Sequence, residues 1–237
     1  PELLPHALRM QLRLPSITEA TRLLHQPPSD TPLAELDNGR HPARRRLAFE
    51  ELLAHQLSLR RLRERTKRQA APPLAGDGEL GQRFLEQLPF TLTSAQQRAW
   101  EEIAADLCQP HPMLRLLQGD VGSGKTVVAA MAALRAVAVG AQAALMAPTE
   151  LLAEQHYHNF RGWLSKLGVE VAWLTGRLAG RMRRALLERL AAGHIPIVVG
   201  THALFQETVD FADLALVIVD EQHRFGVHQR LALREKG

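Results

Sequence analysis

The sequence predicts an α/β fold, in which helices cover both faces of a parallel β-sheet, preceded by a smaller helical region. Two observations predict the sheet: apolar runs that are continuous rather than alternating, and helical stretches of about a dozen residues between most of them. A third observation is the change of pattern near residue 80, before which short helices are punctuated by proline. The 237 residues are 46% hydrophobic and 23% charged, which is sufficient for a buried core.

Composition excludes several classes of protein. The single cysteine, Cys108, excludes a disulfide framework and a cysteine-rich zinc site, and it fits a reducing compartment. No apolar segment is long enough to span a bilayer, and no signal peptide opens the chain. We therefore expect a cytoplasmic protein with no membrane partner. Because the chain begins at Pro1, we also expect a fragment or a processed product.

The net charge of +4 is unevenly distributed along the chain. Residues 1–70 carry 13 Lys and Arg against 8 Asp and Glu, a net of +5, whereas the remaining residues carry 16 against 17, a net of −1. A basic segment on a near-neutral body is typical of a protein with a polyanionic partner. A solvated helix face explains it equally well, so the basic run Arg60–Arg68 is only a secondary candidate for contact with nucleic acid.

The first region is predicted to consist of helices. Ser16 and Glu19 form a capping box ahead of a helix that the pair Pro27-Pro28 ends. Pro42 suits the first turn of a longer helix, which continues to about Lys67 and has apolar residues at helical spacing.

A linker signal ends this region. The stretches Ala71-Pro-Pro and Gly76-Asp-Gly combine the residues that interrupt regular structure most strongly. We therefore divide the chain into residues 1–79 and residues 80–237.

The second region alternates helices with strands. Thr93 is placed to cap a helix that runs to about Leu107, and further helices are expected to start near Lys125, Glu150 and Arg181. Five apolar runs are predicted to be strands, namely Met113–Leu117, Ala143–Ala147, Val169–Leu174, Ile195–Val199 and Leu214–Val219.

A glycine-rich motif follows the first predicted strand and opens a helix. Residues 119–126 satisfy the pattern G-x-x-x-x-G-K-[ST], in which glycines let successive backbone N–H groups point at phosphate oxygens. Lys125 is expected to reach the outer phosphates of a nucleotide, and the Thr126 hydroxyl to ligate Mg²⁺. The predicted nucleotide-binding residues of this loop are Gly119, Asp120, Val121, Gly122, Ser123, Gly124, Lys125 and Thr126.

Two carboxylates follow the last predicted strand. A buried strand that delivers two carboxylates at its carboxyl end is costly unless they have a role, and this end is where α/β folds bind ligands. Asp220 is expected to hold Mg²⁺, directly or through water, and Glu221 to polarise the attacking water. The alternative is that both carboxylates cap the next helix. Beside a phosphate-binding loop, the pattern favours nucleotide hydrolysis.

These motifs and their flanks resemble superfamily 2 helicases and translocases, in particular the RecG family of bacterial ATP-dependent DNA helicases. The similarity covers nearly all of residues 80–237 and extends into the linker through Leu47-Ala-Phe-Glu-Glu-Leu-Leu53. It is carried by Asp220-Glu-Gln-His223 with the following Arg224-Phe-Gly-Val-His-Gln-Arg230, and by the stretches Leu88–Gln96, Met113–Thr126, Ala147–His156 and Gly200–Gln206.

The resemblance implies a RecA-like P-loop NTPase fold and a bacterial cytoplasmic enzyme with ATP and Mg²⁺ as cofactors. The implied activity is ATP-dependent remodelling of branched DNA, such as stalled forks and Holliday junctions, in recombination and repair. Asp220 and Thr126 are the implied metal ligands. The implied catalytic residues are Lys125, Asp220, Glu221, Gln222 and His223, of which Gln222 and His223 would couple the nucleotide state to DNA.

The resemblance also assigns binding roles outside these motifs. Gln96 would contact adenine, with Phe90 nearby as a stacking or packing group, although Thr93 and Gln96 also form a capping box and both roles are compatible. The implied contacts to the DNA backbone, for which ordinary turns and caps are the alternative, are Pro148, Thr149, Thr175, Gly176, Thr201 and His202.

Two further domains are expected in an enzyme of this kind. A second RecA-like lobe closes over the nucleotide, and an oligonucleotide-binding wedge domain splits branched DNA. We expect residues 1–79 to be the helical link that follows a missing wedge domain, and residues 80–237 to be the first RecA-like ATP-binding domain, truncated at its C-terminal end. Such a piece of a monomeric parent should bind ATP·Mg²⁺ weakly and hydrolyse it very poorly alone.

Three other functions are considered. A transcription-repair coupling translocase shares much of this lobe, but its acid motif is more usually Asp-Glu-Glu-His, so Gln222 favours the RecG family. A non-catalytic DNA-binding scaffold is opposed by the intact phosphate-loop and acid-motif residues, Lys125, Thr126, Asp220 and Glu221. A small-molecule phosphotransferase would need a lid between the phosphate loop and Asp220, where the sequence instead holds strand-end motifs for phosphate contact.

Overall fold

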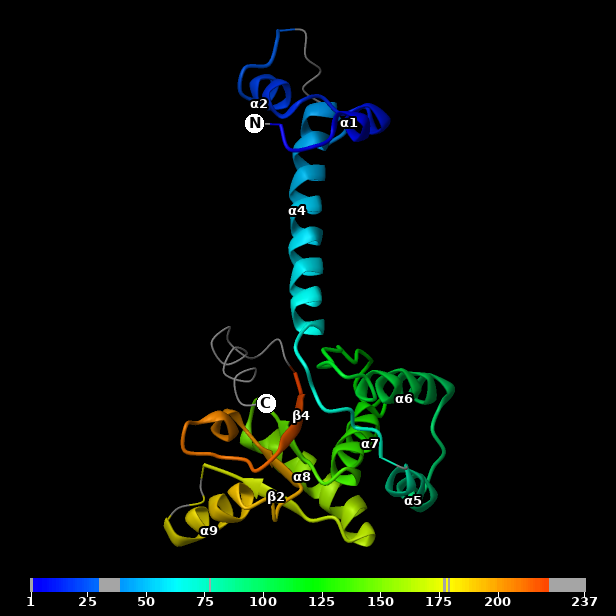
Figure 1. The fold of residues 1–237 in the computed structure, drawn as a ribbon, viewed down its shortest axis with the longest axis vertical. Coiled ribbons are helices and arrows are strands. Elements are labelled where there is room, and N and C mark those ends of the chain that lie inside the picture. Colours follow the sequence, from blue (N-terminus) through cyan, green and yellow to red (C-terminus); the bar gives the residue numbers. More distant parts are fainter. Residues whose placement is uncertain (1, 30–38, 77, 177, 179, 222–237) are drawn as a thin grey trace. The chain divides into compact units, whose positions relative to one another are not determined.

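The chain forms two compact units, Pro1–Gln69 and Ala70–Gly237. Figure 1 shows the helices and strands of each in a computed structural model. The residues that the structure describes are 2–29, 39–76, 78–176, 178 and 180–221. Within these residues, no helix is both long enough and apolar enough to cross a membrane.

The first unit contains the helices α1 (His6–Leu12), α2 (Ile17–His25) and α4 (Pro42–Lys67). The predicted capping box is confirmed, because Glu19 N–H donates to Ser16 Oγ (3.2 Å) and Ser16 N–H donates to Glu19 Oε2 (2.8 Å). α4 begins at Pro42, where the missing N–H of proline has no helical partner to lose, and it packs against α2.

A buried arginine joins the helices of this unit. The side chain of Arg46 is fully buried and forms ion pairs with Glu2 (Nη2–Oε1 2.6 Å) and with Glu50. Glu2 also accepts hydrogen bonds from the backbone N–H groups of Leu4 and Ile17, at 3.0 Å each. These N–H groups, that of Leu4 first, and the guanidinium of Arg46 lower the pKa of Glu2 to about 2.

The basic run lies at the C-terminal end of α4. Arg60, Arg61, Arg65 and Arg68 are exposed, and Arg60 Nε lies 3.2 Å from Glu64 Oε1 one helical turn away. An exposed pair of this kind contributes a few tenths of a kcal/mol at most. The run is therefore a solvated helix face that is also accessible to a polyanion.

The second unit contains a parallel sheet with strand order β2-β3-β1-β4. Its strands are β1 (Gln142–Met146), β2 (Val171–Leu174), β3 (Ile197–Gly200) and β4 (Leu214–Val219), which confirms the predicted α/β class. In the register, Met146 is paired with both Gly200 and Val219, and Leu174 is paired with Gly200. The residues that follow the four strands therefore meet at one edge, the carboxyl edge of the sheet.

Helices cover both faces of this sheet, as predicted. One face carries α7 (Lys125–Ala138) and α8 (Glu150–Leu164). The short 3-10 helix η1 (Ser165–Leu167) follows directly after α8. Two further helices, α5 (Glu79–Gln87) and α6 (Ser94–Leu107), pack against α7. The other face is covered by α9 (Gly180–Ala191) and the 3-10 helix η2 (His202–Phe205).

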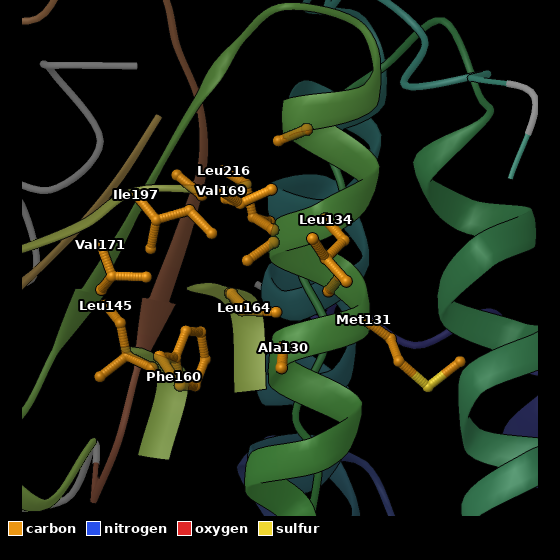
Figure 2. Packing of buried hydrophobic residues seen from close by; sticks show 14 of the residues in the cluster. Ala130, Met131, Leu134, Leu145, Phe160, Leu164, Val169, Val171, Ile197 and Leu216 are labelled. Atoms are coloured by element: carbon orange, nitrogen blue, oxygen red, sulfur yellow. The ribbon is translucent and has the colours of Figure 1, made fainter. Parts of the chain in front are cut away.

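The core lies mainly between the sheet and α7 and α8. Figure 2 shows Leu145, Val171 and Ile197 of three strands on the side of Phe160 and Leu164, which come from α8. All five side chains are buried. Neighbouring positions of the strands point to the opposite face, where a smaller cluster contains Ala144, Ala172 and Val198. Both faces are thus apolar, which explains the continuous apolar runs of the sequence.

The strand predicted at Met113–Leu117 is wrong. This segment has no regular secondary structure, and Leu114 and Leu116 are 76% and 74% exposed. The reason is the arginine in its middle: Arg115 binds Asp106 of α6 (Nη2–Oδ2 2.7 Å), which holds the segment beside that helix. A central parallel strand would have to bury this charge.

The structure places the division between the two units ten residues earlier than the composition suggests, after Gln69 rather than after residue 79. Leu74 is buried in the core of the second unit, and its N–H donates to the carbonyl of Leu107 (2.8 Å). Ala71 N–H likewise donates to Pro110 O at 3.3 Å. The proline-rich stretch is therefore fastened to the end of α6 instead of acting as a free linker.

Candidate nucleotide-binding site

The glycine-rich loop turns sharply into the first residue of α7. Gly122 and Gly124 have positive φ angles, 81° and 79°, and Gly124 is the N-cap of the helix. A Cβ atom on Gly124 would also lie 2.2 Å from Gln96 Nε2. The backbone conformation thus favours glycine here, and any other residue would also displace the amide end of Gln96. Val121 is fully exposed at the tip of the turn. The N-terminal N–H groups of α7, which have no partner within the helix, follow directly after Gly124.

Lys125 folds its side chain back over this loop. Its ammonium group donates to the carbonyls of Gly119 (2.7 Å) and Asp120 (2.8 Å), and Ser123 N–H donates to the carbonyl of Asp120 (3.1 Å). An ammonium group has three N–H donors, so this positive charge is held over the loop by two of them. Thr126 follows as the second residue of α7 and is half-buried.

Gln96 connects the cap of α6 to the loop. Its Oε1 accepts from Thr93 N–H (2.8 Å), while its Nε2 donates to the carbonyl of Ser123 (2.8 Å). Together with the bond from Gln96 N–H to Thr93 Oγ1 (3.2 Å), this confirms the predicted capping box. The side chain of Gln96 therefore positions the loop directly. Phe90, which lies before this helix, is 45% exposed.

Asp220 stands at the carboxyl edge directly after β4. Its N–H donates to the carbonyl of Met146 (2.8 Å), and its Oδ2 lies 2.7 Å from Nε2 of His156 on α8. The hydrogen bond from His156 lowers the pKa of Asp220 against the opposing effect of burial, and the N–H of Glu221 and the charge of Lys125 lower it further. Asp220 is thus held ionised, within electrostatic reach of the loop lysine.

Glu221 adopts a backbone conformation that is rare for a residue with a side chain. Its φ is 51°, in the left-handed region, which costs roughly 1–2 kcal/mol. Strain of this kind is concentrated at functional sites. Gln222, His223 and the flank Arg224–Arg230 lie outside the described residues.

The candidate DNA contacts lie along the same edge. Pro148 and Thr149 precede α8, Thr175 and Gly176 follow β2, and Thr201 and His202 follow β3. Thr149 is the N-cap of α8, where its Oγ1 accepts from Leu152 N–H (3.3 Å). Thr201 is buried, whereas His202 is exposed.

Glu150 ties two of these segments together. Its carboxylate accepts a hydrogen bond from the Thr175 hydroxyl (2.7 Å) and another from Gly176 N–H (3.0 Å). The first residue of α8 therefore fixes the turn after β2. Caps and turns account for Thr149 and Thr175 in this structure, and backbone donors at helix N-termini can serve a phosphate as well.

The profile of the DEAD/DEAH box helicase family matches residues 93–236, more than half of the chain. The chain belongs to the DEAD/DEAH box helicase family. This membership accounts for the RecA-like α/β fold and for the co-location of the loop with the acid motif.

Among DEAD/DEAH box helicases, the chain is similar to proteins named ATP-dependent DNA helicase RecG. It is 60% identical to that of Pasteurella multocida over 222 residues (94% of this chain, 32% of the relative) and 56% identical to that of Escherichia coli K12 over 236 residues (100% and 34%). The solved structure of RecG bound to a three-way DNA junction superposes with a TM-score of 0.81 at 42% identity, covering 95% of this chain and 30% of that one. The chain spans about a third of the length of these relatives, and the resemblance to the RecG family is confirmed.

Sequence reasoning missed two residues of this site. The sequence gives no indication of a role for His156, because no local pattern connects it with Asp220, which lies 64 residues away. Glu150 could have been found, because an acidic residue in the first turn of a helix interacts favourably with nearby N–H donors. Its partners across the edge could not.

Proposed function

We propose that this chain is the ATP-binding part of the motor of a RecG-type ATP-dependent DNA helicase, which remodels branched DNA in recombination and repair. One observation of the structure carries the proposal: a glycine-rich loop at the start of α7 holds the ammonium group of Lys125, and the carboxylate of Asp220, whose pKa the charge of Lys125 helps to lower, stands at the carboxyl edge of a parallel sheet. The names of the relatives, and the branched DNA in one of their structures, support the substrate class.

The loop residues Gly119–Thr126 would bind the phosphates of ATP. Their backbone N–H groups and the N-terminus of α7 supply donors and a positive dipole end. Lys125, which two carbonyls hold over the loop, would exchange these contacts for phosphate oxygens. Gln96 would contact adenine from its fixed position against Ser123, with Phe90 available to stack on the base.

The donor set fits Mg²⁺. The Thr126 hydroxyl and the Asp220 carboxylate are hard oxygen ligands, and a lowered pKa keeps the carboxylate charged. The described residues contain no group of three or more His, Cys, Asp and Glu that could hold a metal. In nucleotide-binding sites Mg²⁺ is usually held by one or two carboxylates together with the phosphates of the nucleotide. When bound, Mg²⁺ would neutralise charge on the phosphates.

Glu221 would orient and polarise the water that attacks the outer phosphate. Its left-handed backbone is strained for a residue with a side chain, which supports a role other than packing. Gln222 and His223 would couple the nucleotide state to DNA. The strand-end residues Pro148, Thr149, Thr175, Gly176, Thr201 and His202 would contact the DNA backbone without reading sequence.

The proposed partners are branched DNA and two other parts of the parent protein, a second RecA-like lobe and a wedge domain. In this proposal the helical link that follows the wedge, expected over residues 1–79, ends with the first unit at Gln69, and the parent is a monomeric bacterial enzyme of the cytoplasm. The alternatives, a transcription-repair coupling translocase and a non-catalytic scaffold, are not favoured by the relatives.

The test is the ATPase activity of the full-length protein with a three-way DNA junction. We expect Lys125→Ala to abolish ATP binding, and Glu221→Gln to retain binding while lowering turnover by about 10²- to 10⁴-fold, the usual contribution of a general base. Lys166→Ala, at an exposed lysine on η1, is the matched control and should behave as wild type. Full ATPase activity after Glu221→Gln would contradict the role of Glu221. Robust DNA-stimulated turnover by residues 1–237 alone would contradict the need for a second lobe.

A further inference from the structure

We propose that His156 is a positioning residue, which holds the carboxylate of Asp220 in the orientation needed to ligate a divalent cation beside the nucleotide. The inference rests on the proposed function, since it assigns a role toward the same metal site. His156 belongs to neither the phosphate loop nor the acid motif, and it comes from the second turn of α8.

The contact is short and sheltered. His156 Nε2 and Asp220 Oδ2 are 2.7 Å apart, the distance of a hydrogen bond with a charged partner, and the two side chains are 14% and 30% exposed. A carboxylate that follows the last residue of a strand can rotate about two side-chain bonds. A hydrogen bond from a packed helix removes that freedom and fixes the orientation of the carboxylate. Ligating carboxylates are commonly held in this way by a second group.

The ring has one hydrogen-bonding atom available for this task. Nδ1 of His156 is buried and has no hydrogen-bond partner within the described part of the chain. A proton on Nδ1 would bury an unpaired donor, which costs about 1–3 kcal/mol, so the favoured tautomer carries its proton on Nε2 and donates it to Asp220. The histidine therefore acts as a directional donor at a fixed distance from α8.

Other groups near His156 do not take over this role. Tyr157 stacks on Trp173 with ring centroids 5.6 Å apart, and His158, which is 63% exposed, pairs with Glu154 on its own helix (3.8 Å). The ammonium of Lys125 affects Asp220 through its charge while its own hydrogen bonds go to the loop. Of these groups, His156 is the side chain that forms a hydrogen bond with the carboxylate of Asp220.

Two amides of different length test the claim. Glutamine places its Nε2 where histidine has Nε2, whereas asparagine places its Nδ2 where histidine has the unpartnered Nδ1. We expect His156→Gln to keep the bond to Asp220 and His156→Asn to lose it, although both variants remain polar and neutral. His158→Asn is the matched control on the same helix.

The readout is the affinity of the full-length protein for Mn²⁺ in the presence of ADP, followed by the electron paramagnetic resonance of free Mn²⁺. His156→Asn should weaken Mn²⁺ binding by about 10- to 100-fold, the usual effect of losing a group that holds a metal ligand, while His156→Gln and His158→Asn stay within a few-fold of wild type. ADP affinity without metal should be the same in all four proteins, which establishes that the asparagine variant is folded.

Two results would overturn the inference. The first is equal Mn²⁺ affinity in the asparagine variant and wild type. The second is an equal loss of Mn²⁺ affinity in the asparagine and glutamine variants, because the length of the donor side chain would then be irrelevant. Failure of the proposed function is distinct. In that case wild-type protein itself would bind ADP without any dependence on Mn²⁺.

Discussion

Gln142 makes a prediction about stability that can be worked out from its hydrogen bonds. This first residue of β1 is 2% exposed. Its Nε2 donates to the carbonyls of Leu190 (3.0 Å) and Ile195 (2.8 Å), and its Oε1 accepts from the N–H groups of Ala212 (2.8 Å) and Asp213 (3.1 Å). All four hydrogen-bonding positions of the amide are therefore used. The amide joins the end of α9 to the segments that lead into β3 and β4.

Gln142→Met keeps the length of the side chain and removes all four bonds. The carbonyl of Leu190 retains the N–H of Gly193 (3.1 Å), so it does not become unpaired. Loss of the donor to the buried carbonyl of Ile195 should lower the free energy of unfolding by about 2 kcal/mol, because this residue is shielded from water. Ala212 and Asp213 are exposed and can bind water, so each lost bond there costs about 0.5–1 kcal/mol. The free energy of unfolding should fall by about 3 kcal/mol.

Urea denaturation followed by tryptophan fluorescence measures this change. The three tryptophans, Trp100, Trp163 and Trp173, lie in the second unit, so the signal reports on that unit. With a slope of about 2 kcal/mol per M, the midpoint should shift by roughly 1.5 M. Gln97→Met is the control, because Gln97 is exposed on α6 and should change stability by less than about 0.5 kcal/mol. A loss below about 1 kcal/mol for Gln142→Met would refute the reasoning.

Two further perturbations address the loop and the first unit. Gly124→Ala should lower ATP affinity at least tenfold in calorimetry, because a side chain at φ 79° costs roughly 1–2 kcal/mol and its Cβ displaces Gln96. The control is Gly162→Ala in α8, where nothing lies within 4 Å of the added atom. Equal ATP affinities of the Gly124→Ala variant and wild type would contradict the argument. The pKa of Glu2 is about 2, below its ordinary 4.5, so its contribution to stability is complete above pH 4.5 and is lost as the pH falls toward 2. Circular dichroism of acid unfolding should show a smaller pH dependence in this range for Glu2→Gln, and an unchanged profile would contradict the role of the network around Arg46.

The elements that sequence predicted best are those whose signals are local. The cap at Ser16, the cap at Thr93 and the helix start at Lys125 each depend on residues within one turn, and the structure has all three. The strand at Leu214–Val219 is identical to its prediction, because its continuous apolar run is a local signal. The phosphate loop belongs to the same class, because its conformation follows from its glycines.

What could not be predicted depends on contacts between different elements. Met113–Leu117 has enough apolar residues for a strand, but Arg115 in its middle binds a carboxylate of α6. The pairing of His156 with Asp220, and that of Glu150 with Thr175, arise only when α8 is laid across the sheet. A histidine or a glutamate inside a helix gives no signal of such a partner. Spacing rules therefore identified the motif residues and missed those that hold them in place.

The two edges of the sheet serve different ends, and energetics separates them. At the amino edge, Gln142 satisfies four polar groups at once, an arrangement that stability alone explains. At the carboxyl edge, Glu221 is strained, and the carboxylates of Asp220 and Glu150 take up side-chain and backbone donors. The strain at Glu221 and the half-buried charge of Asp220 do not improve folding, so these two features require another reason. The net charge of +4 gives no indication of these features, because they consist of carboxylates, backbone N–H groups and one lysine rather than of a basic surface. The carboxyl edge of the sheet is therefore the part of this chain where we expect its function, because stability alone does not explain its strain and its half-buried charge.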